Sequence, residues 1–458
     1  MKTNALDARR RWTVVGVCAL SLFLVGLDTT VVNVGLPAIG RGLDTGTRGL
    51  EWVVDAYTIV LAGLLITSGA LADRFGRRRV FRTGLVVFGL ASVAGAVAPG
   101  LGTLVAARAL QGVGASMLSP VALAIVVNVM PDPRERARAI GIWASVFGLS
   151  MAAGPLVGGA LVTGLGWRWV FWVNVPVVLL ALALTAVVVP ESRAPRARAL
   201  DLPGQALLVL LVGGVVALLI EGPHTGWGSP AVLAGGVLAV LVGIALAVVE
   251  RRRAEPLVDL DLFRRRSFAG AVLGAVLVFV ALSTALLLNT LYLQHVRGSS
   301  ALEAGAATLP MALGATVCAP WSGRLVGRVG PRPPLLLAGG FLVAGGLCLV
   351  GLGDGTPVAL LLAAYLLIGI GFGFANAPLT NTAVGGLPPA RAGVAGGMTS
   401  TARQVGAALG IAIAGGLVAG AGPATLAHAT RPGWLLVAGC GLGVLAVARA
   451  AGSGSGHA

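Results

Sequence analysis

Long apolar runs, separated by short polar or charged stretches, occupy most of the 458-residue chain. A helix of about 20 apolar residues is long enough to cross the hydrocarbon core of a bilayer. The pattern therefore predicts an all-α polytopic membrane protein with fourteen transmembrane helices. We predict these spans at 12–34, 51–72, 80–98, 103–129, 138–163, 168–189, 204–221, 231–249, 268–292, 301–321, 333–352, 357–378, 391–419 and 432–450.

The basic residues between the apolar runs orient these helices. Loops on the cytoplasmic side of a membrane carry an excess of lysine and arginine. If the N-terminus is cytoplasmic, most of the 33 lysines and arginines fall in predicted inner segments, and the C-terminus is cytoplasmic as well. The exceptions are Arg41, Arg48, Arg168, Arg297 and Arg431 in predicted outer segments, and Arg108 and Arg403 within predicted helices.

An arginine-rich hairpin, residues 69–79, joins the second and third predicted helices, and its spacing returns at residues 323–332 between the tenth and eleventh. A shift of eight helices indicates two related six-helix halves with two helices inserted between them, an organisation typical of transporters. The paired positions are Gly69 and Gly323, Arg74 and Arg328, Gly76 and Gly330, and Arg78 and Arg332.

The repeat divides the chain into four predicted parts. Residues 1–189 form the first six-helix bundle, and residues 190–266 hold two charged linkers and the inserted helix pair. Residues 267–450 form the second bundle, and residues 451–458 are a flexible tail of glycine and serine.

Composition removes several classes of function. The chain is 57% hydrophobic and 11% charged, which excludes a soluble globular protein. The net charge of +16 would suit nucleic acid, but the basic residues lie between apolar runs, so their expected partner is the bilayer surface. Because Lys2 is the only lysine, the chain holds no P-loop and is expected not to hydrolyse ATP with one. The four cysteines lie in separate apolar runs without metal spacing, so no cofactor or metal is predicted.

Charged side chains inside a bilayer are costly and are therefore functional candidates. Asp28 and Asp55 are the two carboxylates predicted to lie clearly within the membrane, and Arg108 lies at a similar depth. A low dielectric favours the protonated carboxylic acid and a nearby guanidinium favours the carboxylate, so such a group could load and release protons. A structural Asp–Arg pair, or an Asp55 wetted from outside, remains the alternative. Arg403 could face a central cavity or extend towards the membrane surface.

The fifth predicted helix is rich in small residues and contains a proline. The proline removes a backbone hydrogen bond and kinks the helix, and glycines allow a second helix to approach closely. The helix could seal the transport pathway while still permitting rocking; ordinary helix packing is the alternative. The residues are Gly141, Gly154, Pro155, Gly158 and Gly159.

Several of these segments together resemble the major facilitator superfamily, specifically its fourteen-helix drug:proton antiporter family. The resemblance covers nearly the whole chain: the hairpin 69–79, the first-helix segment 27–37, the fifth helix, and the segments 167–176 and 402–404. Gly35 and Ser150 stand where this family usually has alanine and glycine. The matching positions of the fourth helix are Arg108, Gln111, Gly112 and Gly114.

The resemblance implies roles for particular residues. It implies a cytoplasmic gate at Gly69, Asp73, Arg74, Gly76, Arg77 and Arg78, and antiport rather than uptake from the fifth helix. Together with the membrane depth of Asp55, it makes Asp28, Asn33, Asp55, Arg108, Gln111 and Arg403 the candidates for proton coupling or substrate binding.

The function that this resemblance implies is export of small, partly apolar drugs or antibiotics in exchange for protons, by alternating access. The protein would work as a monomer in the cytoplasmic membrane of a bacterium. A proton-coupled uptake symporter on the same fold is the first alternative. A polytopic enzyme or sensor is the second, although the sequence shows no catalytic triad, metal cluster or phosphate loop.

Overall fold

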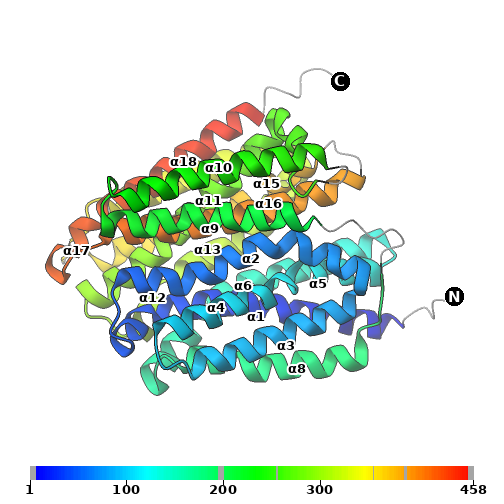
Figure 1. The fold of residues 1–458 in the computed structure, drawn as a ribbon, viewed down its shortest axis with the longest axis horizontal. Helices are drawn as coiled ribbons and strands as arrows, with labels where there is room; N and C mark the ends of the chain where they lie inside the picture. The colour runs from blue at the N-terminus through cyan, green and yellow to red at the C-terminus, as the bar shows by residue number, and fades with distance from the viewer. Residues whose placement is uncertain (1–6, 194–200, 254–255, 354, 386–388, 452–458) are drawn as a thin grey trace.

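The computed structural model describes residues 7–193, 201–253, 256–353, 355–385 and 389–451, and every regular element in these ranges is helical. The helices lie side by side along one common direction (Figure 1). The first helix, α1 (Ala8–Gly42), begins at the end of the bundle where the last one, α18 (Arg431–Ala451), finishes. We call this the terminal end and the opposite one the distal end.

The predicted set of fourteen spans is confirmed. Thirteen helical segments of the described residues are long and apolar enough to cross a membrane, and α6 (Pro133–Leu165) supplies the remaining span. The other helices of the first half are α2 (Thr47–Phe75), α3 (Arg77–Ala96), α4 (Leu101–Ser116), α5 (Ser119–Val129), α7 (Trp169–Trp172) and α8 (Asn174–Val188).

The remaining helices follow the same pattern of long segments and short connections. The inserted pair is α9 (Leu202–Thr225) and α10 (Pro230–Arg252). The second half holds η1 (Leu260–Arg264), α11 (Arg266–Leu291), η2 (Tyr292–Val296), α12 (Ala301–Ala307), α13 (Leu309–Val329), α14 (Arg332–Leu349), α15 (Val358–Val384), α16 (Pro389–Val418) and α17 (Pro423–Ala429), before α18.

Several spans predicted as single helices are interrupted. The fourth span breaks between α4 and α5, where Pro120 follows the first residue of α5 and cannot donate a backbone hydrogen bond. The tenth span breaks at Thr308, and Pro310 is again the second residue of the helix that follows, α13. The sixth span breaks just before Asn174, a residue that returns in the functional site.

The two halves pair their helices in the same way. In the first half α1 packs on α6, α2 on α4, and α3 on α8. Eight spans later the equivalent pairs are α11 with α16, α13 with α15, and α14 with α18. This repeated pairing is the architecture expected from the two hairpins. The exact boundaries between the parts stay predictions, and residues 194–200 and 452–458 lie outside the described residues.

The inserted helix α9 lies over the junction between the halves, where it packs on both α2 and α16 (Figure 1). Thr67 of α2 donates a hydrogen bond to the Gln205 side chain, and the Gln205 amide donates to the Gly63 carbonyl of α2. In contrast, α10 packs mainly on α9 and leaves most of its apolar surface exposed. We therefore expect α10 to face lipid.

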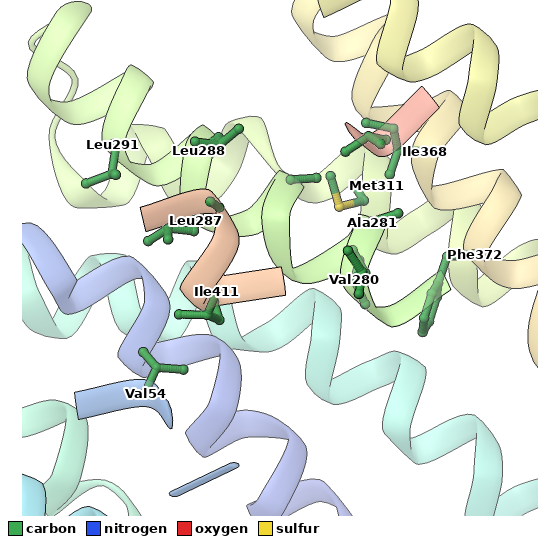
Figure 2. Close-up of a cluster of buried hydrophobic side chains, with 14 of the residues drawn as sticks. Val54, Val280, Ala281, Leu287, Leu288, Leu291, Met311, Ile368, Phe372 and Ile411 are labelled. Atoms are coloured by element: carbon green, nitrogen blue, oxygen red, sulfur yellow. The ribbon is translucent and has the colours of Figure 1, made fainter. Parts of the chain in front are cut away.

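A continuous apolar core joins the halves. It includes residues of α1 and α2 together with residues of α11, α13, α15 and α16. Figure 2 shows Val54 of α2 pointing towards Ile411 of α16 across this junction. The apolar faces of α1 and α2 are therefore held against the opposite half.

Candidate functional site

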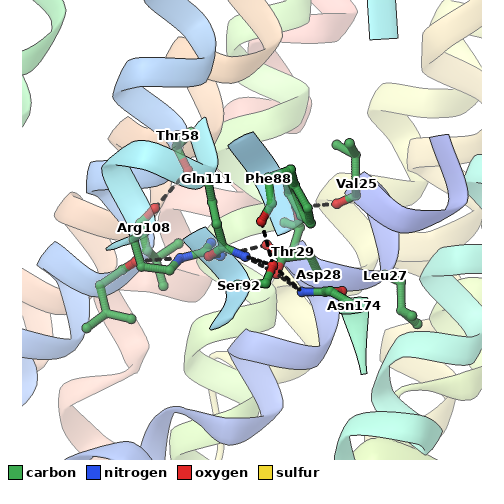
Figure 3. Close-up of polar contacts among 12 residues, drawn as sticks. Val25, Leu27, Asp28, Thr29, Thr58, Phe88, Ser92, Arg108, Gln111 and Asn174 are labelled. Atoms are coloured by element: carbon green, nitrogen blue, oxygen red, sulfur yellow. Dashed lines mark hydrogen bonds and ion pairs between the residues drawn. The ribbon is translucent and has the colours of Figure 1, made fainter. Parts of the chain in front are cut away.

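Asp28 and Arg108 form a buried ion pair in the first half. Arg108 Nη1 lies 2.6 Å from Asp28 Oδ2, and the two side chains are 1% and 0% exposed (Figure 3). Arg108 Nε also donates to the Val53 carbonyl at 3.0 Å, and its guanidinium lies 4.3 Å from the centre of the Tyr57 ring. The contact that the sequence left open between these two helices is present.

Three neutral polar side chains complete this network. The Gln111 amide donates to Asp28 Oδ1 at 3.1 Å, and its carbonyl accepts from Arg108 at 2.9 Å. The Asn174 amide donates to the same Asp28 oxygen at 2.8 Å. Ser92 of α3 accepts a hydrogen bond from Gln111 at 2.9 Å. We call Asp28, Ser92, Arg108, Gln111 and Asn174 the compensated network, because each charge in it has an opposite charge or polar partner.

Glycines on α4 bring its neighbours close enough to build the network. A side chain at Gly112 would come within 2.6 Å of the Tyr57 carbonyl of α2. A side chain at Gly114 would come equally close to the Phe88 amide of α3. Glycine at both positions allows α4 to lie between α2 and α3, with Arg108 and Gln111 directed towards α1.

Asp55 stands apart from that network. It is fully buried, and neither carboxylate oxygen has a hydrogen-bond partner among the described residues. Glu51, one helical turn away on α2, is 1% exposed and equally without partners there. The sequence does not single out Glu51, which lies near the start of α2 and is buried there by packing against α9 and α16.

The hairpin between α2 and α3 turns as the repeat predicts. Gly76 ends α2 with φ +111°, and Gly330 ends α13 with φ +82°, conformations that favour glycine at both equivalent positions. Asp73 lies in the last turn of α2 and forms an ion pair with Arg77, the first residue of α3, at 2.9 Å. Gly69 has open space where a side chain would stand, and Arg74 is exposed.

A residue that the sequence did not single out holds this hairpin. Glu191 follows α8, and its carboxylate accepts hydrogen bonds from the backbone amides of Arg78 and Ser192, both at 3.1 Å. It thus satisfies a free amide at the start of α3, where a negative charge is favourable. The Arg78 guanidinium donates to the Ala186 carbonyl at 2.6 Å, which ties the hairpin to α8.

Three glycines of α6 lie at close helix contacts. Gly154 and Gly158 face Thr30 and Val31 of α1. Gly159 faces the other half: a side chain there would come within 2.5 Å of the α carbon of Leu302 on α12. Gly305 of α12 makes a second close contact between the two halves, because it lies against the Pro155 carbonyl of α6. Gly141 lies in α6, but its surroundings fall outside the described residues.

The other predicted residues lie outside the compensated network. Arg403 of α16 donates to the hydroxyls of Ser400 at 2.7 Å and Thr380 at 3.3 Å, so it folds between α16 and α15. The Asn33 amide donates to the Thr29 carbonyl of its own helix at 2.9 Å. Among the described residues no group of three histidine, cysteine or acidic side chains is placed to hold a metal ion.

Comparison with known proteins identifies the class to which this fold and site belong. A family model described as the Major Facilitator Superfamily matches residues 18–411, so the chain belongs to that superfamily. It is therefore a multi-pass membrane transporter and not an enzyme. Solved structures agree on the fold: a peptide transporter POT in complex with sulfate has a TM-score of 0.69 at 19% identity, over 99% of this chain and 96% of its own. A bacterial homologue of the human lysosomal transporter Spinster, in an inward-facing conformation, has a TM-score of 0.67 at 17% identity, over 97% of both chains.

Curated relatives cover most of the chain at higher identity. The chain is 40% identical to the multidrug resistance protein Stp of Mycobacterium tuberculosis, over 89% of this chain and 76% of Stp. It is 41% identical to the puromycin resistance protein pur8 of Streptomyces alboniger, over 93% and 85%. It is 36% identical to the tetracenomycin C resistance and export protein of Streptomyces glaucescens, over 90% and 76%.

Proposed function

We propose that this protein is a proton-coupled antiporter that exports small, partly apolar drugs or antibiotics across the bacterial cytoplasmic membrane. The observation that carries the proposal is the buried Asp28–Arg108 pair, in a chain that is similar along most of its length to resistance and export proteins. A buried ionisable pair within a transporter is a natural place for proton binding.

Protonation of Asp28 would act on several helices at once. In the ionised form, the Asp28 carboxylate accepts from Arg108 and Gln111 of α4 and from Asn174 of α8. A proton on Asp28 removes the negative charge that favours all three bonds, so α4 and α8 lose part of their attachment to α1. Proton binding thereby favours one arrangement of the helices over another, which is the coupling that antiport needs.

The close contacts between α6 and α12 support alternating access. Gly159 and Gly305 bring the two halves into backbone contact near the distal end, which we assign to the outer face of the membrane. On this assignment, the contact would close the outer side in this conformation, and opening would require these helices to separate. A membrane potential of 100 mV supplies about 2.3 kcal/mol per charge moved, enough for about a fifty-fold concentration ratio without ATP.

Inverted membrane vesicles with an imposed proton gradient provide the test. We expect some members of a panel of antibiotics and dyes to dissipate the gradient in vesicles holding the wild-type protein. Asp28→Asn should abolish the response, because the amide cannot exchange the proton. The matched control is Asp44→Asn, in the exposed loop after α1, where the backbone has φ +49°, a conformation that asparagine tolerates.

Two results would contradict the proposal. In one, no compound dissipates the gradient although the protein is present in the membrane. In the other, right-side-out vesicles show substrate-stimulated proton entry together with uptake, which would identify a symporter.

A further inference from the structure

Two arginine triplets lie on either side of the short connection between α10 and α11. The connection lies at the terminal end of the bundle, because successive spans alternate in direction and α10 is the eighth. All six arginine side chains are exposed, and we call them the linker arginines. They are Arg251, Arg252 and Arg253 at the end of α10, and Arg264, Arg265 and Arg266 around the start of α11.

The acidic residues nearby offset little of this positive charge. Glu250 is 2% exposed, and its carboxylate accepts a hydrogen bond from the Val258 amide at 3.1 Å. Asp201 forms an ion pair with Arg253 at 3.5 Å. Asp261 is the one exposed acid in the described part of the connection. Four linker arginines form no ion pair with another described residue: Arg251, Arg252, Arg264 and Arg266.

The helix α10 places the first triplet at the edge of the hydrocarbon region. Ile244 and Val248 are still 56% and 44% exposed close to its end, and we expect this exposed apolar surface to face lipid. A helix rises about 1.5 Å per residue, so Arg251 lies about 4.5 Å beyond Val248 along the axis. An arginine at the end of a lipid-facing helix holds its charge at the level of the lipid headgroups.

Phe263 lies directly before the second triplet and is 38% exposed. Its ring meets the Phe268 ring edge-on, with the ring centres 5.3 Å apart. Phe268 and Leu262 are buried in a cluster with residues of α15 and α16, so the connection is anchored to the second half. An exposed aromatic ring beside exposed cations is typical of a segment that lies in the membrane interface.

This combination of charge and apolar surface suits a phospholipid. Guanidinium groups bind phosphate through paired hydrogen bonds. Clusters of about four to eight basic residues beside a membrane helix attract anionic lipids. A soluble anion would use the charge alone, whereas a phospholipid can also place its acyl chains against α10 and Phe263.

We propose that the linker arginines, together with Phe263 and the end of α10, form a binding site for an anionic phospholipid in the leaflet at the terminal end. The lipid phosphate accepts hydrogen bonds from the guanidinium groups, and the acyl chains lie along the exposed face of α10. The inference is independent of the proposed function, because lipid binding is a property of the purified protein and does not require transport.

The test uses the purified full-length protein in detergent and a fluorescent phosphatidylglycerol as the probe. Unlabelled phosphatidylglycerol, phosphatidylcholine with the same acyl chains, and inorganic phosphate are compared as competitors. We expect phosphatidylglycerol to compete about tenfold or more better than phosphatidylcholine. Inorganic phosphate should compete weakly, because it has no acyl chains.

Paired substitutions locate the site. Arg251→Gln/Arg252→Gln and Arg264→Gln/Arg266→Gln should each weaken phosphatidylglycerol binding about tenfold. The matched control, Arg328→Gln/Arg332→Gln, removes two exposed arginines from the hairpin at the same end of the bundle and should keep most of the affinity. Phe263→Ser keeps every charge and should weaken binding of both phospholipids.

Melting temperatures separate lipid binding from a structural role. In nanodiscs of phosphatidylcholine alone, the two linker variants should melt like the wild type. Added phosphatidylglycerol should raise the melting temperature of the wild type and of the control variant more than that of either linker variant.

Four results would overturn the inference. In the first, the linker variants bind phosphatidylglycerol like the wild type. In the second, the control variant loses as much affinity as they do, which would indicate diffuse attraction to the whole end of the bundle. In the third, inorganic phosphate displaces the probe as well as phosphatidylglycerol does, which would indicate a site for soluble anions. In the fourth, the linker variants melt at a lower temperature to the same extent with and without phosphatidylglycerol, which would indicate a structural role.

Discussion

Asp28 and Asp55 are both fully buried aspartates in the first half of the molecule, but their surroundings differ completely. Asp28 accepts hydrogen bonds from a guanidinium and two side-chain amides, whereas Asp55 has no partner among the described residues. A compensated charge holds its neighbours in place, whereas an uncompensated carboxylate must be neutralised by a bound proton or cation that can exchange. Stability and ligand exchange are therefore expected to depend on different carboxylates.

Loss of Arg108 should produce the largest effect. Arg108→Gln leaves Asp28 as an uncompensated buried charge, and breaking such a pair typically costs about 3–5 kcal/mol of unfolding free energy. We expect a strongly lowered melting temperature for the purified protein. The double variant Asp28→Asn/Arg108→Gln should recover much of the loss, because no lone charge remains.

Arg403→Gln is the matched control for that experiment. Arg403 is also an arginine within a helix, but its guanidinium donates hydrogen bonds to two neutral hydroxyls. Its substitution should therefore cost clearly less than Arg108→Gln. Equal losses for the two variants would refute the idea that the carboxylate partner makes the difference.

Asn174→Ala should have an intermediate effect. It removes one hydrogen bond to Asp28, and a hydrogen bond to a charged group is typically worth about 1.5–3 kcal/mol. Asn289→Ala is the control, because Asn289 is fully buried in α11 without a side-chain partner among the described residues. The comparison is made by melting temperature; a smaller shift for Asn174 than for Asn289 would contradict the assigned network.

Asp55→Asn should have the smallest effect on stability, and its sign is informative. An amide in place of an uncompensated carboxylic acid removes no observed bond. We therefore expect the free energy of unfolding to stay the same or to rise, by no more than about 1 kcal/mol. Asp28→Asn, measured beside it, should be destabilised. If Asp55→Asn lowered stability as much as Asp28→Asn, Asp55 would have a bonding partner, and the proposed difference between the two sites would be wrong.

The sequence predicted the fold because its signals are local. Each span is a continuous apolar run of sufficient length, and the two hairpins at Gly76 and Gly330 mark the repeat with the same turn residue. The breaks within spans were missed because a single proline such as Pro120 within an apolar run is compatible with a kinked helix as well as with two helices.

The site was predicted where charge made residues conspicuous or, as for Gln111, where a segment resembled the family. Asp28 and Arg108 stood out because charges are rare inside apolar runs, and their similar depth made a contact between them possible. Ser92 has no comparable signal, because a lone serine in a membrane helix is more often a packing residue. Asn174 lies within a segment that resembled the family, although the resemblance gave it no role.

Glu51 was missed for a different reason. Its position near the start of α2 predicts contact with water, and only the packing of α9 and α16 makes it buried. Gly415, the residue that leaves room for its carboxylate, is more than 360 positions away in the sequence. A contact between positions so far apart leaves no local pattern in the sequence, so the sequence alone does not predict it.

Gly159 of α6 lies against the backbone of Leu302 on α12, and Gly305 of α12 lies against the backbone of Pro155 on α6. Any continuous thread of water through a membrane conducts protons, and in the proposed antiporter it would dissipate the gradient that drives export. Two helices that touch at their backbones leave no room for such a thread, whereas a bulky side chain at either position would hold them apart. In the proposed antiporter, these two glycines would therefore limit how much of the proton gradient is lost between export events.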